Sequence, residues 1–400
     1  RPAHNRAVMR SNRIGPMTKL RSPAGVVPLA GCPVRGLWNG APGRSVARYV
    51  CSAVQSRCME CPVCGRDCIE DAQDVLARLP DLFSPCDQCS SRVLDKNAPL
   101  PGRTYAPPCG CGKRFIDEVF ANLYVIYVEE GIFSGKEPLR AVGSPLIHPG
   151  VSTVNPPFLP SGSLVLLSPV VTAPAAERIV AEVPEVRGVV RSGDFVPGTV
   201  DPALEEAPRT YDLLAGCDVR AGVFPTSAGP LVIYTQQSQV HIEFPRQRNP
   251  KIESVERRLE KGLPAVFVDA CAGTGTLGLC AALHGVQRVI LNDAWYAAAY
   301  WSAQNVLVNQ KSLDVRDVTM HLSYSEMRGL QVSRDPLLVA EAGGEQALSV
   351  FFGDYRKLGG VLPPGPACTV LDLFDKSDLE ANRRVMKEWQ DRVPGDVFIP

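Results

Sequence analysis

Val266-Phe-Val-Asp-Ala-Cys-Ala-Gly-Thr-Gly-Thr-Leu-Gly278 is the stretch that decides the fold of this 400-residue chain. A hydrophobic strand ends at Asp269, a turn with Gly273 and Gly275 follows, and a helix that contains Gly278 begins. Glycine permits a positive φ and lets a ligand approach the backbone closely. The N-terminus of the following helix adds free N–H groups that can bind a polar ligand. The stretch therefore predicts a ligand-binding turn between a strand and a helix.

The residues from position 251 onward alternate between predicted strands and helices. Apolar, β-branched runs predict strands at residues 265–269, 288–293, 348–352, 368–373 and 396–399. Helical periodicity predicts helices at residues 254–260, 275–284, 296–309 and 379–390. Strands that alternate with helices form a mostly parallel sheet that is covered on both faces. We therefore expect a Rossmann-like α/β domain over residues 251–400.

Three acids follow three of these strands: Asp269, Asp293 and Asp354. Open α/β sheets bind ligands at the carboxyl ends of their strands, so the three acids point to one site. A carboxylate at Asp269, four residues before Gly273, would face a cationic ligand and repel a pyrophosphate. Asp293 can accept both hydroxyls of a ribose, which fits a dinucleotide equally well. The first acid therefore favours S-adenosylmethionine over a dinucleotide.

The same residues resemble the motifs of class I S-adenosylmethionine-dependent methyltransferases. The family's first motif, acidic-x-x-x-Gly-x-Gly, matches Asp269, Gly273 and Gly275, while its ribose acid matches Asp293 and its adenine-contacting acid matches Asp354. The resemblance covers residues 251–400 and implies a methyltransferase. It also implies a set of cofactor-binding residues: Asp269, Ala270, Gly273, Thr274, Gly275, Asp293 and Asp354.

A narrower likeness lies in residues 291–293 together with Asn305 and Asn309. This run looks like the corresponding segment of RNA guanine methyltransferases of the archaeal and eukaryotic tRNA type. It equally resembles families that modify protein side chains. Both RNA and protein acceptors therefore stay open at this point.

The acceptor motif of the family follows the fourth strand, where this chain reads Leu371-Asp-Leu-Phe-Asp-Lys-Ser-Asp378. The Asn/Asp-Pro-Pro-Tyr/Phe motif of base amino-group methylators is absent, which argues against an exocyclic amine as acceptor. No cysteine follows this strand, which argues against a covalent mechanism at cytosine C5. Asp372 and Asp375 are the candidate catalytic residues, since either can orient or deprotonate an acceptor. The alternative is that they cap the strand and the next helix.

The segments before the methyltransferase-like region predict a helix and then short strands. Residues 113–150 contain one amphipathic helix at residues 114–130 and a linker. Residues 151–250 form a β-rich segment with strands at residues 163–168, 188–191, 231–234 and 240–244. The family sheet normally continues past its fifth strand with a helix and an antiparallel hairpin. We expect either a shorter sheet here or one completed by strands from residues 220–250.

Eight of the 14 cysteines lie in residues 58–112, in short pairs that predict a metal-binding module. The spacing favours a zinc-ribbon-like site made of Cys61, Cys64, Cys86 and Cys89, with a second site made of Cys58, Cys68, Cys109 and Cys111. An iron–sulfur cluster is the alternative, because the first four cysteines have the spacing of a bacterial ferredoxin. The pairing itself cannot be deduced from sequence.

Residues 1–57 form a basic N-terminal arm with ten Lys or Arg and no Asp or Glu, although the whole chain has 42 basic and 42 acidic residues. Such an arm indicates an RNA or acidic partner, a solvated extension or an organellar targeting segment.

No apolar run approaches 18 residues, so we expect no membrane span. Paired free cysteines fit a reducing compartment, and we expect a cytoplasmic protein, with mitochondrial or other organellar targeting left open.

These observations predict a methyltransferase that acts on RNA, either tRNA or rRNA. One alternative is a protein side-chain methyltransferase with a dedicated partner. Another is a non-catalytic assembly protein that keeps the methyltransferase fold.

Overall fold

The computed structural model of the chain describes residues 59–201, 203, 207–374 and 376–400. The chain divides into two units, Arg1–Val54 and Gln55–Pro400, and all of the described residues belong to the second. The predicted basic arm, the candidate metal ligand Cys58 and the candidate catalytic residue Asp375 lie outside the described residues. Among the residues that are described, no helix is long and apolar enough to cross a membrane.

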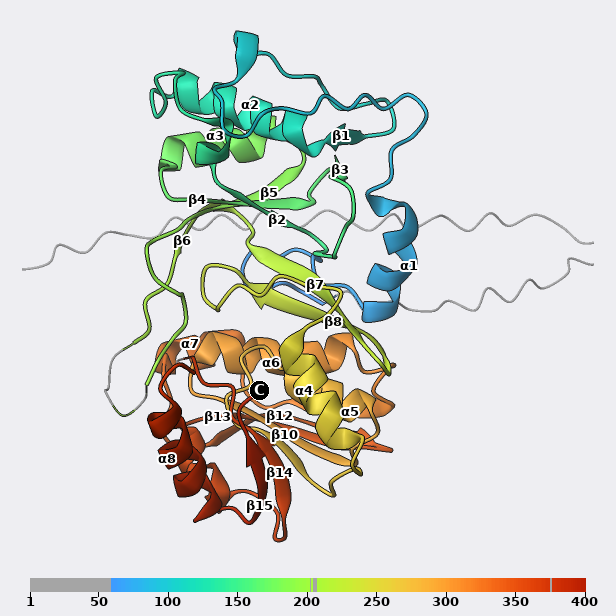
Figure 1. Cartoon of the computed structure of the whole chain (residues 1–400), viewed down its shortest axis with the longest axis vertical. Helices are drawn as coiled ribbons and strands as arrows, with labels where there is room; N and C mark the ends of the chain where they lie inside the picture. Colours follow the sequence, from blue (N-terminus) through green and yellow to red (C-terminus); the bar gives the residue numbers. More distant parts are fainter. Residues whose placement is uncertain (1–58, 202, 204–206, 375) are drawn as a thin grey trace, which may run out of the picture. The chain divides into compact units, whose positions relative to one another are not determined.

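A four-stranded sheet with two helices on one face follows the cysteine-rich segment (Figure 1). The strand order is β2-β4-β5-β6, and α2 and α3 bury their apolar residues against β4 and β5. The helix predicted at residues 114–130 and the strands predicted at 163–168 and 188–191 are confirmed by α2, β4 and β5. The elements up to this sheet are α1 (Ala72–Leu82), β1 (Lys113–Phe115), α2 (Ile116–Glu129), β2 (Ser144–Ile147), β3 (Phe158–Pro160), β4 (Leu164–Ser168), α3 (Ala173–Glu182), β5 (Val186–Arg191) and β6 (Asp212–Gly216).

A separate antiparallel hairpin, β7 (Val219–Thr226) and β8 (Gly229–Gln236), follows this sheet. Its outer strand β8 contains the strand predicted at residues 231–234. Two asparagines of the helix α6 (Tyr296–Val308) and its C-cap hold the edge of β8. Asn305 hydrogen-bonds the backbone N–H and C=O of Tyr234, and Asn309 does the same for Val232. Asn305 and Asn309 thus have a structural role.

The strand predicted at residues 240–244 is wrong, because this segment has no strand partner. Side chains bind one of its carbonyl groups and the carbonyl just before it instead. Trp295 Nε1 donates to the carbonyl of Gln239, and Arg220 Nη2 donates to the carbonyl of Glu243. Pro245 follows and lacks an N–H for a ladder.

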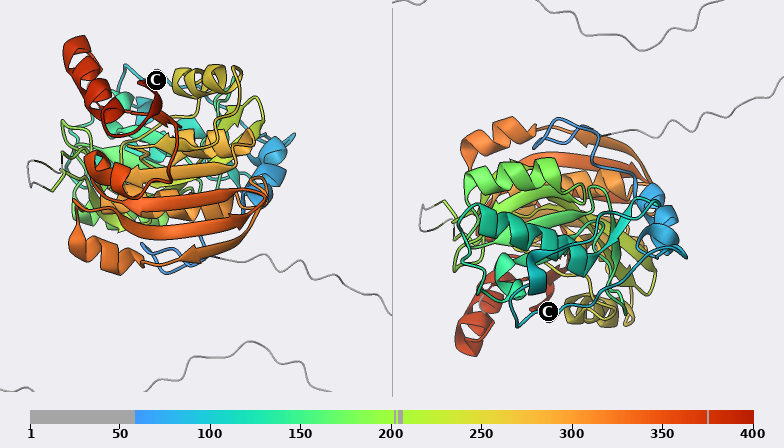
Figure 2. Two further views of the ribbon diagram at one scale, coloured as in Figure 1. Left: turned by 90° about the horizontal axis from the view of Figure 1, so that it is seen from below. Right: turned by 90° about the horizontal axis from the view of Figure 1, so that it is seen from above.

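The last part of the chain is a seven-stranded sheet with helices on both faces (Figures 1 and 2). Its order is β11-β12-β13-β10-β9-β14-β15, and β9, β10, β13, β14 and β15 are parallel. The five predicted strands and four predicted helices of this region are present. The elements are α4 (Pro250–Leu259), β9 (Phe267–Asp269), α5 (Thr276–Leu283), β10 (Arg288–Asp293), β11 (Val315–Met320), α7 (Tyr324–Leu330), β12 (Leu337–Gly344), β13 (Ala347–Phe352), β14 (Ala367–Val370), α8 (Leu379–Gln390) and β15 (Gly395–Phe398).

Alternate residues of the central strands enter two different apolar cores. Phe267 and Leu291 belong to the core under α4, α5 and α6, whereas Val268 and Ile290 belong to the core that contains Trp389 of α8. This alternation follows from the period of two in a β-strand. It confirms the prediction of a Rossmann-like sheet covered on both faces.

The completion of the sheet differs from both expectations. Residues 220–250 add no strand to it, and β7 and β8 pair with each other instead. The extra strands are β11 and β12, which lie antiparallel at the β13 edge. They were not predicted, because β11 alternates polar and apolar residues only weakly and half of its length is exposed.

Candidate cofactor cleft and cysteine centres

The strand order reverses at β9, since β10 pairs along one side of it and β14 along the other. Ligands of open α/β sheets bind outside the carboxyl ends of the strands at this point. A cleft of about 1250 Å³ opens there. The glycine turn after β9 forms one wall, and the hairpin β7–β8 with residues 195–201 contributes to the other. The topology thus places a large cleft at the predicted site.

The glycine turn is held by backbone hydrogen bonds to the neighbouring strand end. The N–H of Ala272 donates to the carbonyl of Asn292, and the N–H of Gly273 donates to Asp293 Oδ2. Gly275 has a φ of +93°, and a Cβ there would lie 2.8 Å from Ser302 Oγ. A Cβ at Gly273 would meet no atom within 4 Å. Gly275 is therefore required for packing, while Gly273 leaves open space.

Ala270, Gly273 and Thr274 line the cleft, as the resemblance implied. Gly275 is not among the lining residues, because it faces Ser302 of α6. Its contribution is to let the turn and α6 approach each other.

Asp269 lies behind the turn rather than in the cleft. Its side chain is fully buried, and its Oδ2 accepts the N–H of Gly278 at 2.8 Å. Its Oδ1 has no hydrogen-bond partner among the described residues. Burial raises the pKa of Asp269 to about 8, and the nearby carboxylates of Asp372 and Asp293 add to the rise. The acid therefore holds the start of α5 against β9.

Asp293 lines the cleft at the end of β10. Its Oδ2 accepts the N–H of Gly273 and its Oδ1 accepts the N–H of Trp295, both at 2.9 Å. Burial raises the pKa of Asp293 to about 6. The carboxylate is thus fixed beside the open glycine, where the ribose acid was expected.

Asp354 does not line the cleft. Its Oδ1 accepts hydrogen bonds from the backbone N–H and the Nε of Arg356 at 3.0 and 2.9 Å. It caps the short 3-10 helix Tyr355–Gly360. Its neighbours Gly353, Tyr355 and Arg356 form the cleft wall instead.

Asn292 is a site residue that the sequence reasoning missed. Its Nδ2 donates to the carbonyl of Ala270 and to the carbonyl of Gly353, so it ties together the ends of three strands. Its Oδ1 is buried and has no partner. The sequence did contain a signal for it, because Asn292 directly precedes the predicted ribose acid Asp293 on a buried strand.

The acceptor end of the cleft contains an acid held between two lysines. Asp372 accepts hydrogen bonds from Lys251 Nζ at 2.7 Å and from Lys376 Nζ at 2.6 Å. Despite burial, which lowers it, the pKa of Lys251 is raised by Asp372 and Glu243. Because both oxygens of Asp372 are occupied, the arrangement suits holding a substrate group better than removing a proton.

The opposite wall contributes cationic and aromatic side chains that the sequence did not identify. Arg209 lies with its guanidinium carbon 3.8 Å from the ring centre of Phe195. The imidazole of His241 packs edge-on against the ring of Phe374, which is 60% exposed. Burial lowers the pKa of His241, which favours its neutral form. All four line the cleft.

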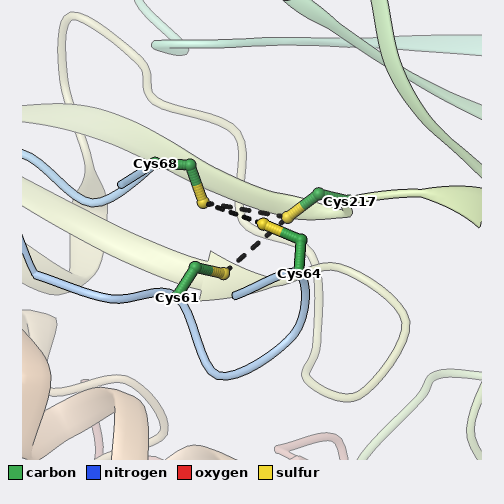
Figure 3. A group of neighbouring side chains, drawn as sticks. All are labelled: Cys61, Cys64, Cys68 and Cys217. Atoms are coloured by element: carbon green, nitrogen blue, oxygen red, sulfur yellow. Dashed lines mark hydrogen bonds between the residues drawn. The ribbon is translucent and has the colours of Figure 1, made fainter. Parts of the chain in front are cut away.

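Eight of the described cysteines form two groups of four in which the sulfur atoms lie within 4.8 Å of one another. The exposed group has sulfur separations of 3.6–3.7 Å and consists of Cys86, Cys89, Cys109 and Cys111. The partly buried group has sulfur separations of 3.7–3.9 Å and consists of Cys61, Cys64, Cys68 and Cys217, whose side chains converge (Figure 3). Four thiolates at about 2.3 Å from one zinc ion lie roughly 3.8 Å apart.

The pairing suggested by the spacing is therefore wrong. Cys61 and Cys64 do not join Cys86 and Cys89, because the two pairs belong to different parts of the fold. Cys217, which no spacing rule connects to the others, completes the first group. Only the folded chain brings it there, 149 residues after Cys68.

No protein-family model and no curated protein matches the chain. Among solved structures it is similar to Trm5b from Pyrococcus abyssi, with TM-score 0.32, 13% identity and coverage of 62% of this chain and 56% of that one. It is similar to P. horikoshii TYW2 in complex with MeSAdo, with TM-score 0.31, 17% identity and coverage of 56% and 62%. The chain thus spans less than two thirds of both structures.

A third solved structure is the SAM-dependent methyltransferase from Agrobacterium tumefaciens, with TM-score 0.29, 11% identity and coverage of 59% of this chain and 75% of that one. The chain's own strand order and glycine turn define its fold more directly than these distant likenesses. With a reversal of strand order at β9, a glycine turn and a fixed acid at the end of β10, the C-terminal sheet has a Rossmann-like fold.

Proposed function

We propose that this chain is an S-adenosylmethionine-dependent methyltransferase. The observation that carries the proposal is the open glycine turn beside Asp293, at the reversal of strand order. Gly273 leaves space for a ligand against the backbone, and Asp293 presents a fixed carboxylate to ribose hydroxyls. Among the described residues, the buried Oδ1 of Asn292 has no hydrogen-bond partner, so its amide oxygen adds negative potential below the turn. This environment fits a cationic nucleoside.

Bound S-adenosylmethionine would supply an electrophilic methyl group. The residues of the chain contribute positioning and exclusion of water, which are the main sources of catalysis in such a displacement. Asp372 with Lys251 and Lys376 would orient the acceptor at the end of β14. We keep Asp372 and Asp375 as the candidate catalytic residues of this step.

Calorimetric titration with S-adenosylmethionine tests the cofactor site. We expect the wild-type chain to bind, and Asp293→Asn to bind roughly tenfold to a hundredfold more weakly, because a charged hydrogen-bond acceptor is lost. Asp317→Asn is the control, since Asp317 is exposed on the edge strand β11. Absence of binding by the wild-type chain would instead favour the non-catalytic assembly protein.

We infer that the acceptor is RNA. Arg209, Lys251 and Lys376 line the cleft and can contact phosphates, whereas Arg220 is buried and donates to the carbonyl of Glu243. The exposed ring of Phe374 and the stacked pair of Arg209 and Phe195 offer planar faces for an unstacked base. The basic arm at residues 1–57 adds positive charge in the sequence.

Fluorescence titration of the full chain with tRNA at several salt concentrations tests this inference. We expect affinity to fall steeply with salt, and Arg209→Ala to reduce both affinity and slope. Arg383→Ala is the matched control, because it removes an exposed cation on α8 that does not line the cleft. An affinity for tRNA that does not change with salt concentration would contradict this inference. Co-purification of one dedicated protein would favour a protein acceptor.

We propose that the two cysteine groups each bind one zinc ion. All four sulfur atoms of each group lie within 4.8 Å of one another, which fits a single tetrahedral ion, whereas the four thiolates of a cluster with two or four irons do not all bind the same metal and so do not all lie this close together. Tight turns support the ligands, since the N–H of Gly65 donates to the carbonyl of Cys61 and the N–H of Gly112 donates to that of Cys109. Metal analysis of the purified chain should give two zinc ions and no acid-labile sulfide.

A further inference from the structure

The partly buried cysteine group draws its fourth sulfur from a different part of the chain. Cys61, Cys64 and Cys68 come from the N-terminal loop, whereas Cys217 lies two residues before β7 (Figure 3). Cys61 and Cys217 are each 1% exposed. We infer that these four cysteines bind one metal ion that fixes the β7–β8 hairpin, and that this metal thereby controls the affinity of the cofactor cleft. The inference rests on the proposed binding of S-adenosylmethionine.

The metal would add a second anchor to the hairpin, because Cys217 precedes β7 whereas Asn305 and Asn309 contact β8. A two-stranded hairpin is only marginally stable by itself. Within the described residues, β7 and β8 pair only with each other, apart from a single bridge between Gly150 and Gly222. Yet the hairpin supplies part of the cleft wall through Arg220, Gly222, Phe224, Ile233 and Thr235. Whatever fixes the hairpin therefore shapes the cleft.

A short chain of hydrogen bonds connects the metal loop to the glycine turn. The N–H of Glu70, two residues after Cys68, donates to Tyr234 Oη at 3.0 Å. The backbone of Tyr234 is bound on both its N–H and C=O by Asn305. Asn305 Nδ2 also donates to the carbonyl of Thr274 at 2.9 Å. Tyr234 and Asn305 are fully buried, so these contacts are shielded from water.

Positive charge surrounds this cysteine group, as a centre with four thiolates requires. Arg66 lies in the loop between Cys64 and Cys68 and lines the pocket beside Cys64, Cys68 and Cys217. Arg187 lines the adjoining pocket, and its Nε has no hydrogen-bond partner. Four thiolates around a divalent ion leave a net charge of −2, which these guanidinium groups offset.

Within the part of the chain that the structure describes, the exposed cysteine group has no comparable connection to the cleft. Its ligands hold the loop before β1, where the N–H of Cys109 donates to the carbonyl of Lys113 and Lys113 Nζ donates to the carbonyl of Ser84. None of these residues lines the cleft. The exposed group therefore provides a matched control for the loss of one zinc.

The experiment compares Cys217→Ser with Cys111→Ser in the full chain. Zinc is counted by metal mass spectrometry, and S-adenosylmethionine affinity is measured by calorimetry. We expect each variant to lose one of two zinc ions, and only Cys217→Ser to weaken cofactor binding, by about tenfold. Cofactor affinities that are the same in both variants and in the wild type would overturn the inference.

Tyr234→Phe keeps the inference testable if Cys217→Ser does not fold. The variant removes the acceptor of the Glu70 N–H and leaves all eight sulfur ligands in place. We expect two zinc ions and weaker cofactor binding. Because coupling is reciprocal, the cofactor should slow zinc release from the buried group in the wild type and not in Tyr234→Phe. The coupling between zinc and cofactor would be contradicted if Tyr234→Phe bound the cofactor as tightly as the wild type and if the cofactor slowed zinc release from it equally.

Two outcomes separate this inference from the proposed function. A wild-type chain that binds two zinc ions but no S-adenosylmethionine refutes the proposed methyltransferase, while the zinc count of Cys217→Ser still tests the fourth ligand. A zinc count that Cys217→Ser does not change refutes the ligand assignment, while cofactor binding by the wild type stands.

Discussion

Asp269 and Asp293 show how differently two strand-end acids behave. Asp293 lies in the cleft and uses both oxygens to hold the turn. Asp269 is buried behind it with one oxygen unpaired, and its pKa of about 8 means that it is protonated at pH 7 in the free protein. A bound cation would favour its ionised form, because opposite charge lowers the pKa of a carboxyl.

Asp269 should make the folded state less stable as pH rises. The folded protein holds a proton at this residue between about pH 4 and pH 8, whereas the unfolded chain, with a carboxyl pKa of 3.8, has released it. The free energy of unfolding should therefore fall across this range, by up to about 1.4 kcal/mol for each pH unit. Urea unfolding of the wild type and Asp269→Asn at pH 5 to 8 measures the difference. Parallel pH profiles would refute the prediction.

Gly275→Ala should destabilise the chain for two reasons that can be separated. The substitution introduces a side chain at a φ of +93° and places its Cβ 2.8 Å from Ser302 Oγ. Gly285→Ala shares the positive φ of +90°, but its Cβ would lie 3.8 Å from the nearest atom, Leu263 Cδ1. We expect Gly285→Ala to cost about 1 kcal/mol and Gly275→Ala about 3 kcal/mol in thermal unfolding. Equal costs would mean that the contact with α6 is unimportant.

At the scale of elements, α6 substitutes for a missing neighbour strand of β8. Asn305 and Asn309 are one helical turn apart, which is about 6 Å along α6. Val232 and Tyr234 are two residues apart, which is about 6.8 Å along β8. The two spacings are close enough for each asparagine to satisfy one residue of the strand edge. Helix and strand are thereby held in one register.

Asn305→Ala should therefore lower the free energy of unfolding by about 3 kcal/mol. The substitution leaves the N–H and C=O of Tyr234 and the C=O of Thr274 buried without this partner. Gln310→Ala is the control, because Gln310 lies just beyond the end of α6 and is only partly buried. The measurement is urea unfolding, and a loss no larger than that of the control would show that the asparagine does not anchor β8.

At the scale of the whole molecule, the two cysteine groups differ in access to solvent. Cys86 and Cys111 are exposed, whereas Cys61 and Cys217 are buried. An excess of a chromogenic chelator should thus remove zinc in two phases of equal amplitude. The first should be fast, and the second should be limited by local opening. Cys111→Ser should show the slow phase alone, whereas a single phase in the wild type would contradict this prediction.

The sequence by itself determined the alternation of strands and helices from residue 251 onward, the turn after Asp269 and the placement of acids at strand ends. These features are local, because side-chain periodicity and glycine turns each depend on only a few consecutive residues. Three outcomes depended on tertiary structure: Cys217 in a metal-like group, Asp372 between two lysines, and Asp269 behind the turn instead of in the cleft. Each requires residues from distant segments to meet. The spacing of residues along the chain does not predict such contacts. They depend on which sheet faces and edges stay accessible after the elements pack.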